Sequence, residues 1–148
     1  MYGASRVRAA RVLATALLAA AAPQAGAEGP YAYITPDDLK SRIQSQAPLT
    51  ILDIQVEEEF ALHHIRGAVA TFAYPVRSEE EKTRLEAVYP NLAGGSDPVV
   101  IVCPRGGGGA QRTYDYLVGR GMDARRLLIL EKGQAGWPFP DLLEGGGK

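Results

Sequence analysis

Four consecutive aliphatic residues, Val99 to Val102, lead directly into Cys103, the single cysteine of the chain. Pro104 and Arg105 follow, and then come four glycines and a segment, 110–120, with the composition of a helix. A continuous apolar run of this length is typical of a strand buried on both faces, and a helix directly after such a strand is typical of a parallel sheet. The pattern therefore favours an α/β architecture with the sulfur between a strand end and a helix start.

The rest of the chain repeats this alternation of strand-like and helix-like segments. Strands are predicted over residues 31–34, 49–54, 68–74, 99–102 and 127–130, and helices over residues 36–45, 57–62, 78–89 and 110–120. Thr35 with Pro36 predicts one helix start, and Ser78 with Glu81 predicts another through a capping box. Pro90 is expected to open a loop. We therefore expect an α/β fold in which a parallel sheet is flanked by helices on both faces.

The first 27 residues have the layout of a secretory signal peptide. Three arginines precede an apolar run over residues 12–22, and small side chains at Ala25 and Ala27 suit a signal peptidase. The run is too short to cross a bilayer, which needs about 20 apolar residues. We expect cleavage before Glu28 and export to the bacterial periplasm or the medium, with no stable membrane anchor afterwards. The alternative is an uncleaved N-terminal anchor.

Composition excludes several classes of function. After cleavage, 13 basic and 17 acidic residues leave a formal charge of −4, so no basic field is available for nucleic acid. A single cysteine can neither close an internal disulfide nor supply a cysteine-rich zinc site. An unpaired thiol is unusual in an oxidising compartment. Cys103 is therefore a core residue, a reactive thiol or a link to another chain.

The position of Cys103 favours a stabilised thiolate. Ligands of open α/β sheets bind beyond the carboxyl ends of the strands, where a helix N-terminus offers unpaired N–H groups. Four glycines, 106–109, allow consecutive N–H groups to turn inward without Cβ clashes, and Arg105 adds a cation. The alternative is a buried structural cysteine followed by a glycine turn. A phosphate-binding loop is disfavoured because no Gly-Lys-Ser/Thr ends the glycine run.

Three motifs, in the right order, resemble those of the rhodanese-domain family. The first motif comprises Asp53-Ile54-Gln55, then Glu58-Glu59-Phe60, and then His64-Ile65-Arg66-Gly67-Ala68. The second is Cys103 with Gly106, Ala110 and Gln111. The third, residues 131–137, resembles the closing L-x-G-G-x-x-x-W of the family. Together they cover about residues 31–143. The resemblance implies a rhodanese-like α/β domain over residues 28–143, and the glycine-rich residues 144–148 are expected to form a flexible tail.

The resemblance also implies a sulfurtransferase that needs no metal and no organic cofactor. Cys103 would be the nucleophile that takes a sulfane sulfur from thiosulfate or a similar small anion and passes it, as a persulfide, to a thiol or cyanide. The N–H groups of residues 104 to 108 would hold the substrate, and the substrate-binding residues are therefore Pro104, Arg105, Gly106, Gly107 and Gly108. We expect Asp53, at a strand end, to orient this loop through hydrogen bonds.

Departures from the family pattern separate the alternatives. Related phosphatases and arsenate reductases use C-x5-R, and the position of that arginine is Gly109 here, so a phosphatase would lack its phosphoryl clamp. Gln55 stands where the family usually has arginine, and Gly108 and Gly109 stand where it often has arginine followed by serine or threonine. The donor and acceptor therefore stay open. The alternative function is a non-catalytic carrier of sulfur or selenium, or an anion-binding module, that acts with a partner protein.

Other conspicuous residues are expected to have structural roles. Adjacent His63 and His64 point in different directions on a helix or a strand, which disfavours a shared metal. We expect His64 to pack or to form hydrogen bonds, and Trp137 to anchor the C-terminal segment rather than line the mouth of the site. The acidic runs 57–59 and 79–81 are expected to be solvated helix faces.

Overall fold

A five-stranded parallel sheet forms the centre of the computed structural model, which describes residues 29–146. Its strand order is β1-β6-β5-β2-β4. The strands are β1 (Tyr33–Ile34), β2 (Thr50–Asp53), β4 (Val69–Ala70), β5 (Val99–Val102) and β6 (Leu127–Leu130). The predicted signal peptide, residues 1–27, lies outside the described residues.

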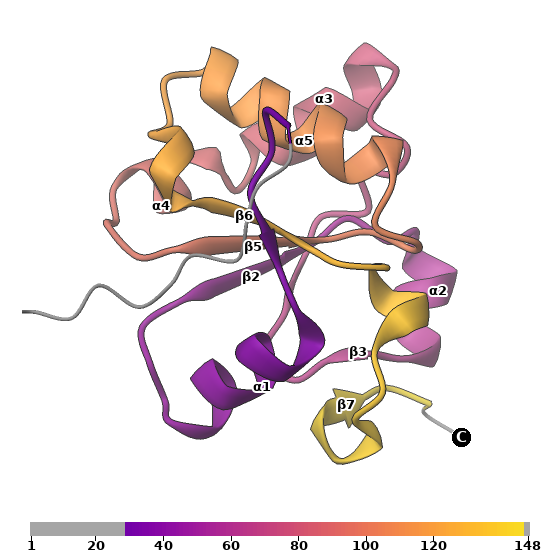
Figure 1. Ribbon diagram of the computed structural model, residues 1–148. Coiled ribbons are helices and arrows are strands. Elements are labelled where there is room, and N and C mark those ends of the chain that lie inside the picture. Colours follow the sequence, from indigo (N-terminus) through magenta and orange to yellow (C-terminus); the bar gives the residue numbers. More distant parts are fainter. Residues whose placement is uncertain (1–28, 147–148) are drawn as a thin grey trace, which may run out of the picture.

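Helices cover both faces of this sheet, which confirms the predicted layers (Figure 1). On one face lie α3 (Glu79–Glu86), α4 (Tyr89–Ala93) and α5 (Gly108–Gly119), and on the other lies α1 (Pro36–Gln44). Short elements complete the fold: α2 (Glu57–Leu62) and the 3-10 turns η1 (Ala124–Arg126), η2 (Gln134–Gly136) and η3 (Pro140–Leu142). Within residues 29–146, no helix combines the length and apolar character that a membrane span requires.

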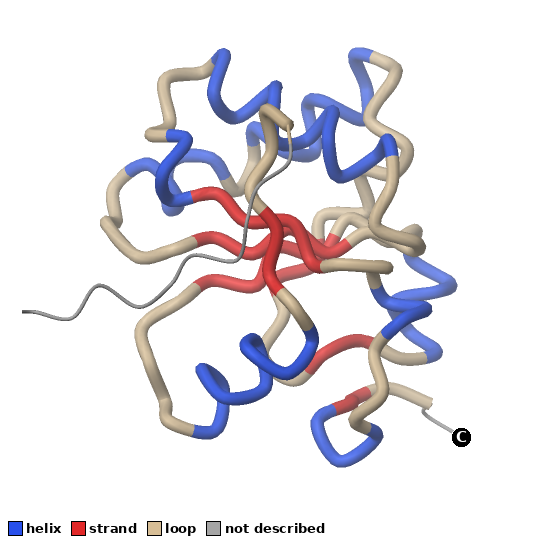
Figure 2. Tube along the Cα trace, in the orientation of Figure 1, coloured by secondary structure: helices blue, strands red, loops and turns tan. Residues whose placement is uncertain are grey.

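Each face of the sheet has its own apolar core, with the strands as a layer between the helices (Figure 2). All four residues of β5 are buried, and alternate ones join opposite clusters. Val99 and Ile101 pack in the cluster that includes Leu117 of α5, whereas Val100 and Val102 pack in the one that includes Leu39 of α1. Strand β5 is therefore fixed from both sides up to the residue before Cys103.

Local capping signals work as predicted. The hydroxyl of Thr35 accepts a hydrogen bond from the N–H of Asp38 at 3.1 Å, and α1 begins at Pro36. Ser78 and Glu81 form the reciprocal capping box at the start of α3. These helix starts need no tertiary information, because the donors and acceptors lie within one turn.

Several predicted segments have different bounds in the structure, and the strands expected over 31–34 and 49–54 are shortened to β1 and β2. The helix expected over 78–89 ends at Glu86, and Pro90 lies inside α4 rather than in a loop. The helix expected over 110–120 begins earlier, at Gly108, so half of the glycine run is helical. The strand expected over 68–74 is reduced to β4, because Phe72 takes a positive φ of 56° and cannot continue an extended strand.

A second, two-stranded sheet was not predicted. Strand β3 (His64–Ile65) pairs antiparallel with β7 (Leu143–Glu144), and the N–H of Gly146 donates to the carbonyl of Ala61 at 3.0 Å. Part of the segment expected as a flexible tail, residues 144–146, therefore bonds through its backbone to the end of α2 and to β3. Residues 147–148 lie outside the described part.

Candidate active site

Cys103 follows β5 directly and begins the cysteine loop, residues 103–109, which runs into α5. In Figure 1 this loop lies at the same end of the sheet as α2, beyond the carboxyl ends of the strands. The cysteine is free and only 1% exposed. Its Sγ accepts a hydrogen bond from the N–H of Gly106, with 2.9 Å between nitrogen and sulfur. A strand end, a short turn and a helix start thus enclose the sulfur, as the sequence predicts.

The cysteine loop rests on the supporting loop, residues 131–133, and on the first residues of η2 after it. The N–H of Gln134 donates to the carbonyl of Cys103 at 2.8 Å, and the N–H of Ala135 donates to the carbonyl of Pro104 at 2.9 Å. Gly133 has a φ of +57°, and a Cβ there would overlap the Cys103 carbonyl and lie 2.7 Å from the Arg105 nitrogen. Only glycine fits this close approach of two backbones.

Gly106 forms the other half of this contact. Its φ is +73°, and a Cβ on it would lie 2.7 Å from the backbone nitrogen of Lys132. Lys132 itself has a φ of +60°, at the position where the closing motif L-x-G-G-x-x-x-W has its first glycine. The two loops therefore fix the N–H that reaches the sulfur, and sequence reasoning did not foresee this support although the closing motif was its signal.

The residues of the expected substrate cradle, 104–108, have different surroundings. Pro104 cannot donate, because its ring nitrogen carries no hydrogen, and its carbonyl is already bonded to Ala135. Among the described residues, the backbone N–H that meets Sγ at hydrogen-bond distance is that of Gly106. Arg105, Gly107 and Gly108 are exposed. They border the loop on its outer side, where the side-chain cation of Arg105 faces solvent.

Two glycines at the start of α5 leave room for neighbouring side chains. A Cβ on Gly109 would lie 2.8 Å from Cδ2 of Tyr74 and 3.3 Å from Cδ1 of Ile54. A Cβ on Gly108 would lie 2.8 Å from Nη1 of Arg112. The Nε of Arg112 donates to the carbonyl of Pro75 at 2.8 Å. Arg112 was missed in the sequence, although its helical spacing of four residues from Gly108 places it on that side.

Asp53 lies beside the end of β5, in register with Val102, and its residue is 0% exposed. Its carboxylate accepts hydrogen bonds from the N–H of Gln55 at 2.8 Å and from Nε2 of Gln55 at 2.9 Å. Burial raises the pKa of Asp53 to about 6 despite these bonds. Within residues 29–146, the carboxylate bonds only to Gln55. In this part of the chain it forms no hydrogen bond with the cysteine loop itself, so its expected role in orienting that loop stays a prediction.

The remaining singled-out residues have packing roles. Nδ1 of His64 lies 2.8 Å from the carbonyl oxygen of Phe60, and its ring stacks on that of Phe60 at 3.7 Å. Trp137 is buried among the residues on the α1 side of the sheet, and its Nε1 donates to the carbonyl of Phe139 at 2.9 Å. Residues 57–59 are exposed. In the described part of the chain, no three His, Cys, Asp or Glu side chains gather as a metal site.

Comparison with known proteins adds a family and a set of related folds. The model of the rhodanese-like domain family matches residues 35–138. A rhodanese-like domain protein from Staphylococcus aureus is 25% identical, with 78% of this chain and 98% of that chain covered and a TM-score of 0.55. No curated protein matches the chain.

Two further solved structures have other activities in their names. A yeast protein tyrosine phosphatase of the rhodanese family is 16% identical, with 76% and 91% of the two chains covered and a TM-score of 0.59. The As-Sb reductase from Leishmania major is 16% identical, with 78% and 86% covered and a TM-score of 0.60. The shared fold therefore does not decide between activities, and the residues around the cysteine must do so.

Proposed function

Because the chain belongs to the rhodanese-like domain family, we propose that it is a sulfurtransferase that carries a sulfane sulfur on Cys103. The observation that carries this proposal is the hydrogen bond from the Gly106 N–H to Sγ, made by a backbone that the supporting loop holds in place. A donor fixed before charge develops stabilises a sulfur anion without reorganisation. We also propose that residues 1–27 direct export to the periplasm or the medium.

The first half of the reaction loads the cysteine. The Cys103 thiolate attacks the outer sulfur of thiosulfate or a similar donor, a bond forms between Sγ and that sulfur, and the sulfur–sulfur bond of the donor breaks. Sulfite leaves with the electron pair, and Cys103 becomes a persulfide. The exposed cation of Arg105 attracts the oxyanion of the donor to the loop.

The second half returns the enzyme to its starting state. A thiolate or cyanide attacks the outer sulfur of the persulfide, the bond to Sγ breaks, and Cys103 leaves as the thiolate that Gly106 stabilises. No second cysteine is needed because the acceptor is external, and the two half-reactions predict ping-pong kinetics.

The surroundings of Gly109 support sulfur transfer over phosphate chemistry. An arginine in the sixth position after the cysteine would have to displace the ring of Tyr74, since even a Cβ there would lie 2.8 Å from it. The loop therefore has no place for the guanidinium that holds a phosphoryl group in C-x5-R enzymes.

A non-catalytic carrier is the second candidate, and Gln55 favours it. The residue brings an amide rather than a positive charge to the buried Asp53, so the site has fewer charges than the family pattern suggests. In this function the persulfide, or its selenium analogue, would pass to a partner protein rather than to a small acceptor.

Cys103→Ser distinguishes these functions. With thiosulfate as donor and cyanide as acceptor, the purified protein should turn over and the variant should fall to the rate without protein. Intact mass after thiosulfate alone should show one added sulfur on the unaltered protein and none on the variant. A sulfur gain without turnover would favour the carrier, and no gain would overturn both. The same spectrum tests cleavage before Glu28.

A further inference from the structure

A pocket of about 440 Å³ lies between the start of α3 and the outer side of α5. Its lining residues are Val76, Arg77, Lys82, Arg112, Asp115 and Tyr116, which we call the basic pocket. Three of these six side chains carry a positive charge and one carries a negative charge. The volume falls within the range of roughly 300–1,000 Å³ that is usual for small-molecule sites.

Arg112 connects the basic pocket to the cysteine loop. Helical side chains lean toward the N-terminus of their helix, and Arg112 leans back along α5 until its Nη1 occupies the space beside Gly108. Its Nε is bonded to the carbonyl of Pro75 at 2.8 Å, which fixes the plane of the guanidinium. Arg112 also lines the pocket, and no carboxylate within residues 29–146 forms an ion pair with it.

The other charges leave the basic pocket with a positive surplus. Lys82 pairs with Glu79 at 2.8 Å, but the Glu79 side chain is 90% exposed, so water weakens this pair. Arg77 forms no ion pair with any described residue. Asp115, the one acidic residue of the lining, accepts a hydrogen bond from the hydroxyl of Tyr31 at 2.9 Å. A partly enclosed, positively charged hollow of this kind attracts anions.

We propose that the basic pocket binds the carboxylate of the sulfur acceptor, a small anionic thiol, and that Arg112 determines this specificity. The proposal rests on the proposed sulfur transfer. The link between the pocket and the cysteine loop is Arg112, whose Nη1 lies beside Gly108. A thiol with a carboxylate at its far end can attack the persulfide while the planar guanidinium binds both carboxylate oxygens.

The test compares two acceptors of similar length, mercaptopropionate, which carries a carboxylate, and mercaptoethanol, which is neutral. With thiosulfate as donor, Arg112→Gln should lower kcat/KM for mercaptopropionate by about tenfold and leave mercaptoethanol unchanged. Arg112→Lys should retain part of the preference, because it keeps the charge without the planar fork. An unchanged preference in Arg112→Gln, or an equal fall for both thiols, would overturn the proposal.

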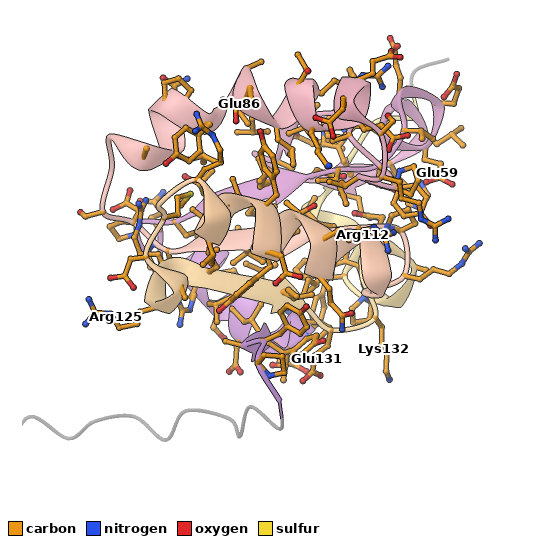
Figure 3. The ribbon with its side chains drawn as sticks, turned by 90° about the horizontal axis from the view of Figure 1, so that it is seen from above. Glu59, Glu86, Arg112, Arg125, Glu131 and Lys132 are labelled. Atoms are coloured by element: carbon orange, nitrogen blue, oxygen red, sulfur yellow. The ribbon has the colours of Figure 1, made fainter. Side chains whose placement is uncertain are left out.

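Arg125→Gln is the matched control. Figure 3 shows Arg112 on α5 and Arg125 at the opposite end of the molecule, where it pairs with Asp123 at 2.6 Å. Its removal changes the net charge by the same amount as the loss of Arg112, so a general electrostatic effect would lower both variants alike. We expect the acceptor preference of Arg125→Gln to equal that of the unaltered protein.

A binding measurement separates this proposal from the proposed function. Calorimetric titration of Cys103→Ser with mercaptopropionate should show binding that Cys103→Ser/Arg112→Gln weakens by about tenfold. If Cys103→Ser binds this ligand through Arg112 while the unaltered protein transfers sulfur to no acceptor, the proposed sulfur transfer is refuted and the proposed carboxylate binding is supported. If sulfur passes equally well to both thiols and no binding is seen, the proposed carboxylate binding is refuted and the proposed sulfur transfer is supported.

Discussion

The ends of β5 and β2 lie side by side and place their acidic groups, the Cys103 thiol and the Asp53 carboxyl, in different environments. Val102 and Asp53 are partners in the register of the two strands, and the residue after Val102 is Cys103. The sulfur of Cys103 receives an N–H from a loop that ends in a helix start. The carboxylate of Asp53 receives two hydrogen bonds from Gln55 but is fully buried.

This difference shows that hydrogen bonds alone do not make a place for a negative charge. At Asp53, burial outweighs two donors and raises the pKa to about 6, because neither the amide nor the N–H of Gln55 carries a positive charge. At Cys103, the loop brings its donor together with the N-terminus of the twelve-residue helix α5, whose dipole favours an anion. One strand end therefore offers a backbone donor and a helix N-terminus, whereas burial at its neighbour favours the neutral form of Asp53 below about pH 6.

The largest effect is expected for Gly133→Ala, which disrupts the contact between the supporting loop and the cysteine loop. The added methyl group would overlap the Cys103 carbonyl and the Gly106 nitrogen at a φ of +57°. We expect a loss of about 3 kcal/mol in the free energy of unfolding and, in the folded fraction, a fall of about a hundredfold in turnover. Urea denaturation and the thiosulfate–cyanide assay measure the two effects.

Gly107→Ala is the control for that substitution. Gly107 is exposed, and a Cβ on it would have no heavy atom within 4 Å outside its chain neighbours. The free energy of unfolding of Gly107→Ala should therefore lie within about 0.5 kcal/mol of that of the unaltered protein. Equal losses in the two variants would mean that the loop tolerates no side chain anywhere, and the specific role of Gly133 would be refuted.

Asp53→Asn should change how stability depends on pH. The folded pKa, about 6, lies above the ordinary value of 3.8, so the folded chain binds more protons between these values. The contribution of Asp53 is therefore fully present below about pH 4 and is lost as the pH rises through 6. The difference corresponds to about 3 kcal/mol, by which the variant should gain on the unaltered protein between pH 4 and pH 7.

Urea denaturation of both proteins at several pH values measures this gain. Other carboxylates whose pKa is lowered, such as Glu86 beside Arg120 and Asp123 beside Arg125, are present in both proteins and cancel in the difference. A difference that stays constant from pH 4 to pH 7 would show that Asp53 is ionised without penalty in the fold.

The smallest effect is expected for Lys132→Gly in the supporting loop. Lys132 has a φ of +60°, which a residue with a Cβ adopts at a cost, and its side chain is exposed. Glycine should therefore raise the free energy of unfolding by about 1 kcal/mol and leave turnover unchanged. A decrease in the urea midpoint would mean that contacts of the lysine side chain outweigh the relief of its backbone.

Sequence patterns predicted those elements whose causes are local. The capping box of Ser78 and Glu81 lies within one helical turn, and the apolar run of β5 identifies itself by composition. The pairing of β3 with β7 could not be predicted, because each strand has two residues and the partners, around His64 and Glu144, lie far apart in the sequence. Such short strands exist only through their tertiary contacts.

The same distinction holds for the active site. The position of Cys103 between a strand end and a helix start follows from one continuous segment and was predicted correctly. The contact of Gly106 with Gly133 joins two loops, and its glycines carry no polar pattern that would reveal it. Arg112 lies on a helix that was predicted, yet its direction depends on the bond to the carbonyl of Pro75, which the sequence does not reveal.

The ring of Tyr74 against Gly109 limits how this protein can diverge in evolution. An arginine introduced at position 109 would be disruptive while Tyr74 is present, whereas a smaller residue at position 74 opens the space first. A change toward a C-x5-R loop therefore meets this clash first unless the side chain at position 74 changes before it. The Tyr74 ring thus opposes a change from the present cysteine loop to a C-x5-R loop within the same fold.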